Sequence, residues 1–541
     1  MAATRRVRAF KRWMKSQGIE CSDALQLCDC PSTGLSVKAL CDLSEGDVVA
    51  RIPKQACLTI RTNAARELIE AAGLDGCLGL SVALMFERSL GNASAWAPYL
   101  HLLPYQECLP LVWTSKEVDS LLCGTELHKD EGFFWVFLGK LIARDKAVKE
   151  DKVLIYEDWK ESILPLLELE SFQLDPSFFD IKDYFAAKTL IASRSFEIDD
   201  YHGFGMVPLS DLYNHKTAAE DVHFTSVSSH SESDTEGDRN EMSEQSNDDD
   251  YDNERDQEHE PTPVSSMDNV ELGIAFSKRK SQSDSHLEDM AVWGHEPAAL
   301  EMIMIKDVKV GAEVYNTYGS LGNAALLHRY GFTEPDNPFD IVNIDLELVL
   351  QWSLSLFSSR RSRARVSLWR KLGYSGCVSQ NSEYFEISFD GEPQIELLIV
   401  LHILLLPEDA YHKLDFAVAA AGKLEEFKGD FGMFLFEGTS EMNRDTLMNK
   451  NVGSALLTLV NMRECLYGTS SLEDDIEALE RCCPIKERKL YHSLMLRISE
   501  RRILEKCRTY VADAARMRIR KRASTRRKVK RTRNGDYGTL L

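Results

Sequence analysis

Residues 206–215 read MVPLSDLYNH, and residues 314–332 read VYNTYGSLGNAALLHRYGF. Polar residues lie beside apolar runs in both stretches: Asn214 and His215 in the first, and Asn-Thr-Tyr-Gly at 316–319 in the second. Polar groups are costly to bury unless they are hydrogen-bonded, so this pattern is typical of a site. Either stretch alone would also fit a cap, a satisfied turn or a strand end. Because both occur in one chain and in this order, we predict that they form one shared site.

The first stretch resembles the MVPLADMLNH signature, and the second the NTYG and YGF signatures, of SET-domain protein methyltransferases. The subgroup in question is typified by Rubisco large-subunit methyltransferase and ribosomal-protein lysine methyltransferases. The resemblance implies an α+β fold class: a SET β-fold with a pseudoknot and a helical insertion, followed by an all-helical C-terminal domain. In the pseudoknot the second stretch threads beneath the first, an exception to the usual unknotted connections.

Length and composition predict how the chain is divided. A chain of 541 residues is too long for one ordinary core, so we expect at least two domains. Residues 228–260 contain no Val, Ile, Leu, Phe or Trp, so they cannot bury enough apolar area to offset their ordering entropy. Combined with these observations, the resemblance implies a SET domain at 1–335, a helical substrate-binding-like domain at 336–515 and a basic tail at 516–541. Within the SET domain we place the helical insertion, a disordered acidic insert and a polar loop, at about 60–190, 228–268 and 277–290.

Patterns of apolar residues predict several elements. Helical spacing of four apolar residues predicts an opening helix, formed around Val7, Phe10, Trp13 and Met14. Residues 34–40 and 48–53 flank a glycine-bearing turn and predict a β-hairpin. Further strands are predicted at 220–227, 269–276 and 300–305. Residues 133–138 are expected in the core, as are Trp96 and Tyr99 of a segment that resembles the subgroup's SxWxPYLxxLP pattern.

The resemblance assigns roles to individual residues. The predicted hairpin resembles the family's GxGLxAxxxIxxGxxxxxIP pattern, with Ser32 in place of the first glycine, and its turn approaches the methionine end of S-adenosylmethionine. The residues that the resemblance assigns to cofactor binding are Thr33, Gly34, Leu35, Arg194, Asn214, His215 and Tyr330. Tyr318 is the implied catalytic residue, and Ser195 and Phe196 of an SRAF-like segment are the implied substrate-binding residues. The same residues also fit structural roles, such as core packing for Tyr330, a backbone-satisfied buried histidine for His215 and a helix-end arginine for Arg194.

The implied reaction is methyl transfer from S-adenosylmethionine to a protein lysine. Such an in-line displacement needs alignment of nucleophile, methyl group and sulfur in a site closed to water. Desolvation near the sulfonium lowers the pKa of the lysine, so no dedicated base is required. Phe196 favours lysine over histidine, because a phenyl ring suits an alkyl-ammonium, whereas a related histidine-specific subgroup has Asn there. The alternatives are a protein-histidine methyltransferase and a non-catalytic SET scaffold that recruits partners.

Charge and cysteines indicate the partners and the compartment. The net charge is −22, while residues 516–533 hold 11 Lys and Arg and no acid. An acidic body favours a basic protein substrate, and the resemblance suggests a ribosomal or nuclear protein. The basic tail predicts nuclear localisation through an import receptor, with additional cytoplasmic protein, RNA contact or a solvated charge run as alternatives.

Thirteen cysteines without zinc-finger spacing predict reduced thiols and no metal. We expect no secretory signal and, because residues 397–406 are too few to cross a bilayer, no membrane partner.

Overall fold

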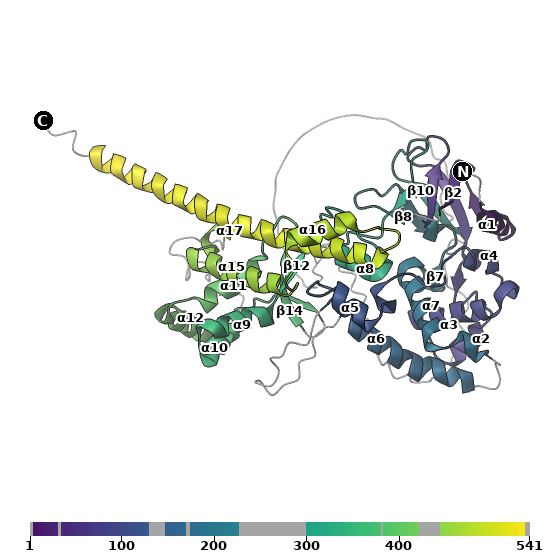
Figure 1. Ribbon diagram of the computed structural model, residues 1–541, viewed down its shortest axis with the longest axis horizontal. Coiled ribbons are helices and arrows are strands. Elements are labelled where there is room, and N and C mark those ends of the chain that lie inside the picture. Colours follow the sequence, from purple (N-terminus) through teal and green to yellow (C-terminus); the bar gives the residue numbers. More distant parts are fainter. Residues whose placement is uncertain are drawn as a thin grey trace, which may run out of the picture. The chain divides into compact units, whose positions relative to one another are not determined.

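The computed structural model describes residues 4–30, 34–128, 147–168, 174–226, 299–379, 382–420 and 444–535 (Figure 1). Several predictions from the sequence fall outside these residues. They concern the cofactor role of Thr33, the core residues at 133–138, the acidic insert, the strand at 269–276 and the polar loop.

The predicted opening helix is confirmed as α1, Arg5–Ser16. It begins where the side chain of Thr4 accepts a hydrogen bond from the backbone N–H of Val7, an N-cap that satisfies one free donor of the first turn. Its apolar face is buried through Val7, Phe10, Trp13 and Met14. The ring of Trp13 stacks on Tyr99, with centroids 6.1 Å apart, so α1 is attached to the core of the first domain.

The first domain contains several small sheets. An antiparallel sheet has the order β1-β4-β10-β9, formed by Glu20–Cys21, Val48–Pro53, Ala299–Met304 and Val222–Ser226. A second has the order β5-β7-β6, formed by Leu58–Thr59, Gly203–Met206 and Ser195–Asp199. The strands β2 and β3 pair as Leu25–Cys30 and Gly34–Ala39. The predicted strands at 220–227 and 300–305 are confirmed as β9 and β10.

The predicted hairpin is correct in its strands but wrong in its pairing. Strand β3 pairs with β2, whereas β4 pairs with β1 and β10. The segment between β3 and β4 turns instead toward residues far along the chain. Leu43 bridges Val308, and the Gly46 N–H donates to the carbonyl of Met304. The partner β2 lies only three residues before β3 and was not predicted as a strand, so the sequence suggested the next strand along the chain.

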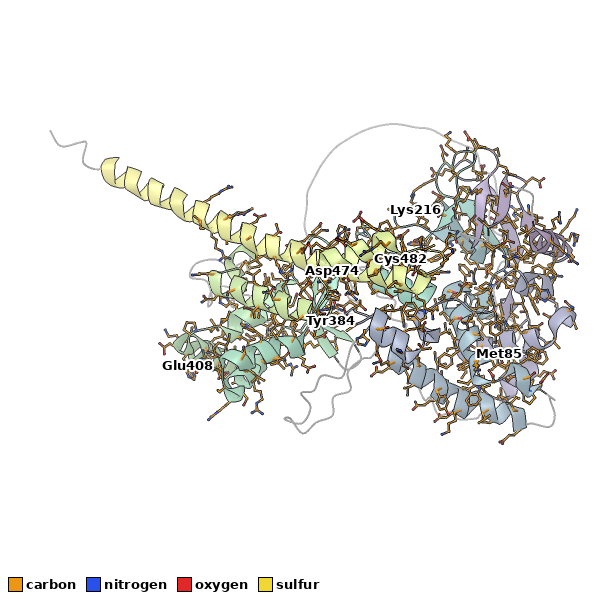
Figure 2. All side chains as sticks on the ribbon, in the orientation of Figure 1. Met85, Lys216, Tyr384, Glu408, Asp474 and Cys482 are labelled. Atoms are coloured by element: carbon orange, nitrogen blue, oxygen red, sulfur yellow. The ribbon has the colours of Figure 1, made fainter. Side chains whose placement is uncertain are left out.

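The two polar stretches do meet, as predicted. Strand β8, Asn214–His215, pairs in parallel with β11, Tyr315–Asn316, so that Asn214 lies opposite Tyr315 and His215 opposite Asn316. Lys216, labelled in Figure 2, follows β8 directly, and its ammonium lies 5.5 Å from the ring centre of Tyr315. This short parallel pair fixes the register of the site.

Helices form the insertion and the wall beside β8. The α-helices of this part are α2 (Arg66–Ala71), α3 (Gly76–Ser89), α4 (Ala97–Leu100), α5 (Ser115–Leu121), α6 (Ala147–Asp158), α7 (Ile181–Arg194) and α8 (Asn323–Tyr330). Helix α7 ends at Arg194 and leads directly into β6, which places that arginine at the site. Trp96 and Tyr99 are buried, as predicted.

The second domain is mainly helical, and it also contains a sheet that the sequence prediction omitted. The sheet has the order β12-β14-β13, formed by Val342–Asp345, Ser382–Ile387 and Cys377–Ser379. The helices described there are α9 (Leu346–Leu356), α10 (Ser359–Lys371), α11 (Ile395–Leu404), α12 (Glu408–Ala420), α14 (Arg444–Leu447), α15 (Lys450–Cys465), α16 (Leu472–Arg481) and α17 (Arg488–Gly535).

The basic region is not separated from the second domain as the sequence suggested. Helix α17 continues through residues 516–535, so most of the predicted tail extends a helix that packs against α15 and α16 (Figure 1). Within the part of the chain that the structure describes, no helix has the length and apolarity required to cross a membrane.

Candidate active site

A cavity of about 500 Å³ lies beside the β8–β11 pair. Its wall includes most of the residues that the sequence assigned to the cofactor and to catalysis, namely Gly34, Leu35, Arg194, Asn214, His215, Tyr318 and Tyr330. The structure therefore brings together residues from β3, α7, β8, the segment after β11 and α8.

The two predicted substrate residues lie elsewhere. The hydroxyl of Ser195 donates to the carbonyl of Ile191 at 2.7 Å, at the end of α7. The ring of Phe196 packs against Phe224 of β9, with centroids 5.4 Å apart. Neither residue lines the cavity. Their role in substrate binding stays a prediction.

Asn214 connects two walls of the cavity. Its amide nitrogen donates to the carbonyl of Leu35 at 3.0 Å and to Glu313 Oε1 at 2.7 Å. The side chain thus holds the cavity-facing end of β3 in place, a role that removal of the amide would abolish.

His215 links the two stretches through its ring. Its Nδ1 lies 3.0 Å from the backbone N–H of Tyr318 and accepts that hydrogen bond. The ring proton is therefore on Nε2, which lies 3.4 Å from Thr217 Oγ1. Burial lowers the pKa of His215, although the nearby Glu334 opposes this effect. A neutral His215 is consistent with the accepted bond, and the residue orients Tyr318.

The hydroxyl of Tyr318 is fixed and uncharged. It donates to the backbone carbonyl of Tyr213 at 2.9 Å. Burial raises the pKa of Tyr318 well above its ordinary value, with a smaller opposing effect from Arg194. The phenol therefore stays protonated at neutral pH and does not serve as a base, but its oxygen can still accept a hydrogen bond. The ring packs against Tyr330 and His215, with centroids 4.4 Å and 5.1 Å away.

Arg194 is engaged by two carboxyl-bearing residues. Its Nε and Nη2 donate to Glu107 Oε1 at 2.9 Å and 2.7 Å, and its Nη1 donates to the Asp211 carbonyl at 2.8 Å. The Asp211 Oδ2 accepts the hydroxyl of Tyr99 at 2.8 Å, whereas Oδ1 is buried without a partner among the described residues. Burial alone would lower the pKa of Arg194. The charges of Glu107 and Asp211 more than offset this effect, so the pKa lies above its ordinary value.

The cavity wall carries charges of both signs. Besides Glu107, Asp211 and Arg194 it includes Arg6 and Arg488, and the buried Asp211 Oδ1 has no partner among the described residues. Burial raises the pKa of Asp211 to about 6, while Arg194 counteracts that rise. Arg194 lines the cavity while bound to Glu107 and Asp211, and its assigned role in cofactor binding stays a prediction.

The sequence analysis missed several cavity residues, among them Asp211, Phe332 and Glu107. Asp211 lies within the first quoted stretch and Phe332 ends the second, so their positions carried a signal. Glu107 lies in a loop between α4 and α5, where no pattern marks it. Elsewhere in the described ranges, no group of three or more His, Cys, Asp and Glu side chains is arranged to hold a metal.

Comparison with known proteins shows which sequences this chain resembles. No family model matches the chain. The chain is 25% identical to "Ribosomal lysine N-methyltransferase 3" of Saccharomyces cerevisiae over 396 residues, which cover 68% of this chain and 69% of the relative. It is 23% identical to "N-lysine methyltransferase setd6" of Xenopus tropicalis over 532 residues, which cover 92% and 93% of the two chains.

Solved structures agree with these relatives. The structure of Rubisco LSMT bound to AdoMet matches with a TM-score of 0.56 and 18% identity, covering 94% of this chain and 92% of that one. The SET domain of LSMT bound to lysine and AdoHcy matches with the same TM-score. This chain has the SET-domain fold, and relatives in sequence are named lysine methyltransferases. Its SET domain carries the cavity, and the predicted fold class is confirmed.

Proposed function

We propose that this SET-domain protein is a protein-lysine N-methyltransferase that transfers a methyl group from S-adenosylmethionine to a lysine of a protein substrate. The decisive observation is the fixed, neutral hydroxyl of Tyr318 in a cavity whose wall also holds Asn214 and His215. Relatives that share this fold are named as lysine methyltransferases.

The cavity fits this cofactor. Its volume of about 500 Å³ lies within the range of roughly 300–1,000 Å³ that is usual for small-molecule sites. Glu107, which lines the cavity, would hold the ammonium of the methionine end, with Asp211 behind it in the wall. Tyr330 and Phe332 offer ring faces to the adenine.

The protein's own residues would orient the reaction. When bound, S-adenosylmethionine supplies a sulfonium-activated methyl group. The oxygen of Tyr318 would accept a hydrogen bond from the substrate amine, while its own proton stays on that oxygen and is donated to the Tyr213 carbonyl. The site requires an amine already deprotonated, and burial beside a positive charge lowers the pKa of a lysine.

The names of the relatives favour lysine over histidine as the acceptor. Phe196, which packs on Phe224 at 5.4 Å and does not line the cavity, stays a predicted substrate residue. The experiment is calorimetric binding of S-adenosylmethionine, combined with mass spectrometry of matched lysine and histidine peptide libraries. Methylation of histidine peptides alone would support a protein-histidine methyltransferase. Absence of cofactor binding would support a non-catalytic SET scaffold that recruits partners.

We propose a basic ribosomal or nuclear protein as the substrate, and the nucleus as a main location. The acidic composition and the names of the ribosomal relatives support this proposal. The residues that would direct nuclear import lie at 516–533, and RNA contact by the same region is the alternative.

Deletion of residues 516–541 should move the protein out of the nucleus and leave peptide methylation unchanged. The deletion begins beyond Val511, which is buried against the second domain, so the fold should be preserved. Imaging of the tagged protein, beside an assay of the purified variant, measures both effects. Nuclear retention of the shortened protein would argue against the targeting role.

Cofactor affinity should depend on pH through Asp211. Its folded pKa, raised to about 6, exceeds the ordinary value of 3.8, so the stability gained from protonation is full below about 4 and lost as pH rises through 6. The ionised form adds a negative charge to the cavity wall, which favours the positive ammonium and sulfonium of the cofactor. The Kd for S-adenosylmethionine should therefore be about tenfold higher at pH 5 than at pH 7. Calorimetry across this range measures the effect, and Asp211→Asn should flatten it.

A further inference from the structure

We infer that Arg6 and Asp29 form a clamp that positions the cofactor-facing end of the β2–β3 hairpin, so that Arg6 is a positioning residue for the proposed reaction. The inference rests on the proposed function for the identity of the ligand. It concerns an N-terminal helix that none of the motifs covers.

The clamp is a two-pronged ion pair. The Nε of Arg6 donates to Asp29 Oδ2 at 2.7 Å, and Nη2 donates to Oδ1. The hydroxyl of Thr4 also donates to Asp29 Oδ2 at 2.7 Å. Hydrogen bonding from Arg6 lowers the pKa of Asp29, so the carboxylate is charged. Paired N–H donors fix both the distance and the direction of the carboxylate.

The position of Asp29 connects the clamp to the cavity. Asp29 lies directly opposite Leu35 in the β2–β3 register, and Cys30 lies opposite Gly34. Gly34 and Leu35 both line the cavity, and the Leu35 carbonyl is held from the other side by Asn214. The cavity-facing end of β3 is therefore held by Asn214 on one side and, through Asp29, by Arg6 on the other.

Arg6 also belongs to the cavity wall itself. Its Nη1 donates to the carbonyl of Leu102 at 3.2 Å, and the residue lines the cavity beside Leu102 and Gly34. A guanidinium has five N–H groups, and the bonds to Asp29 and Leu102 use three of them. Arg6 thus joins α1, the hairpin and the 102–108 loop at the cavity.

Attachment of α1 does not depend on this pair. The helix is held by its apolar face, in which Val7 and Phe10 are fully buried, whereas the side chain of Arg6 is 46% exposed. A partly exposed ion pair contributes little to stability. Loss of the clamp should therefore appear in cofactor binding rather than in unfolding.

The test compares Arg6→Gln, Asp29→Asn and the double variant with the full-length parent. Arg12→Gln is the matched control, because it removes the same charge from an exposed position on the same helix. The first measurement is calorimetric Kd for S-adenosylmethionine. The second is hydrogen exchange of the β3 amides, residues 34–39, in protein without cofactor.

We expect each single variant to raise Kd about tenfold, to leave kcat at saturating cofactor unchanged, and to speed exchange of the β3 amides. The double variant should bind the cofactor no more weakly than either single variant, because Arg6→Gln and Asp29→Asn remove the same interaction. Arg6→Lys keeps the charge without the two-pronged bond and should fall between parent and Arg6→Gln. Arg12→Gln should match the parent in every measurement.

The outcomes separate this inference from the proposed function. If the parent binds cofactor and Arg6→Gln binds equally well with unchanged exchange, the clamp is wrong. If the parent itself binds no cofactor, the proposed function fails, and the exchange data alone decide the clamp: faster β3 exchange supports it and unchanged exchange overturns it.

Discussion

The variant Tyr318→Phe should lose methyl transfer by a hundredfold or more while keeping the affinity for S-adenosylmethionine within about tenfold, or roughly 1.4 kcal/mol. The change removes the hydroxyl that donates to the Tyr213 carbonyl and retains the ring that packs against Tyr330 and His215. An interaction made mainly in the transition state affects kcat more than binding. Single-turnover methylation beside calorimetry measures the two effects separately.

Tyr330→Phe is the matched control. Tyr330 lines the same cavity, and its ring centre lies 4.4 Å from that of Tyr318, so the control removes a neighbouring hydroxyl with the same change in size. It should alter the rate far less than Tyr318→Phe. Asn214→Ala should show the opposite order of effects and weaken cofactor binding first, because it releases the Leu35 carbonyl. Equal turnover by Tyr318→Phe and the parent would exclude Tyr318 as the catalytic residue.

The candidate site could largely be predicted because its residues lie in short, continuous stretches. Asn214 and His215 form β8, and Tyr318 follows β11 after one residue, so local sequence carried both halves. Pairing of the halves was inferred from resemblance, and the parallel register between β8 and β11 confirms that they meet.

Features that depend on unpredicted or distant partners were missed. Strand β3 was predicted, but its partner β2, three residues upstream, was not, and β4 pairs instead with the distant β10. Glu107 enters the site only because α7 places Arg194 beside its loop. The SEYFEI run of β14 does alternate, with Phe385 and Ile387 buried, but the surrounding helical periodicity concealed it.

A buried charge cluster joins the second domain to the insertion. Arg463 of α15 donates to the Gly124 carbonyl at 2.6 Å, to Glu126 at 3.0 Å and to the Asn343 carbonyl at 3.2 Å. Glu500 of α17 accepts from the backbone N–H of Glu126 at 3.0 Å. Arg463 therefore offsets two carboxyl groups that are both removed from water.

Arg463→Met should destabilise the protein by about 3–5 kcal/mol, because it leaves the buried carboxyl groups of Glu126 and Glu500 without their cation. For a domain of this size, each kcal/mol lowers Tm by about 2–4 °C, so a fall of roughly 6–20 °C is expected. Scanning calorimetry measures it. Arg481→Met is the control, because this arginine of α16 is 73% exposed and its loss should hardly change Tm.

The pH dependence of this defect identifies its cause. Burial raises the pKa of Glu500 to about 8, with a further rise from Glu126 that Arg463 opposes. Because the folded value exceeds the ordinary 4.5, stability from protonation is full below about 4.5 and lost as pH rises through 8. Without Arg463 the ionised carboxylate is costlier, so the Tm difference between Arg463→Met and the parent should be smaller at pH 5.5 than at pH 8. Glu500→Gln on the Arg463→Met background should recover part of the loss at pH 8. A Tm difference that is the same at both pH values would mean that lost packing, rather than an unpaired carboxylate, causes the defect.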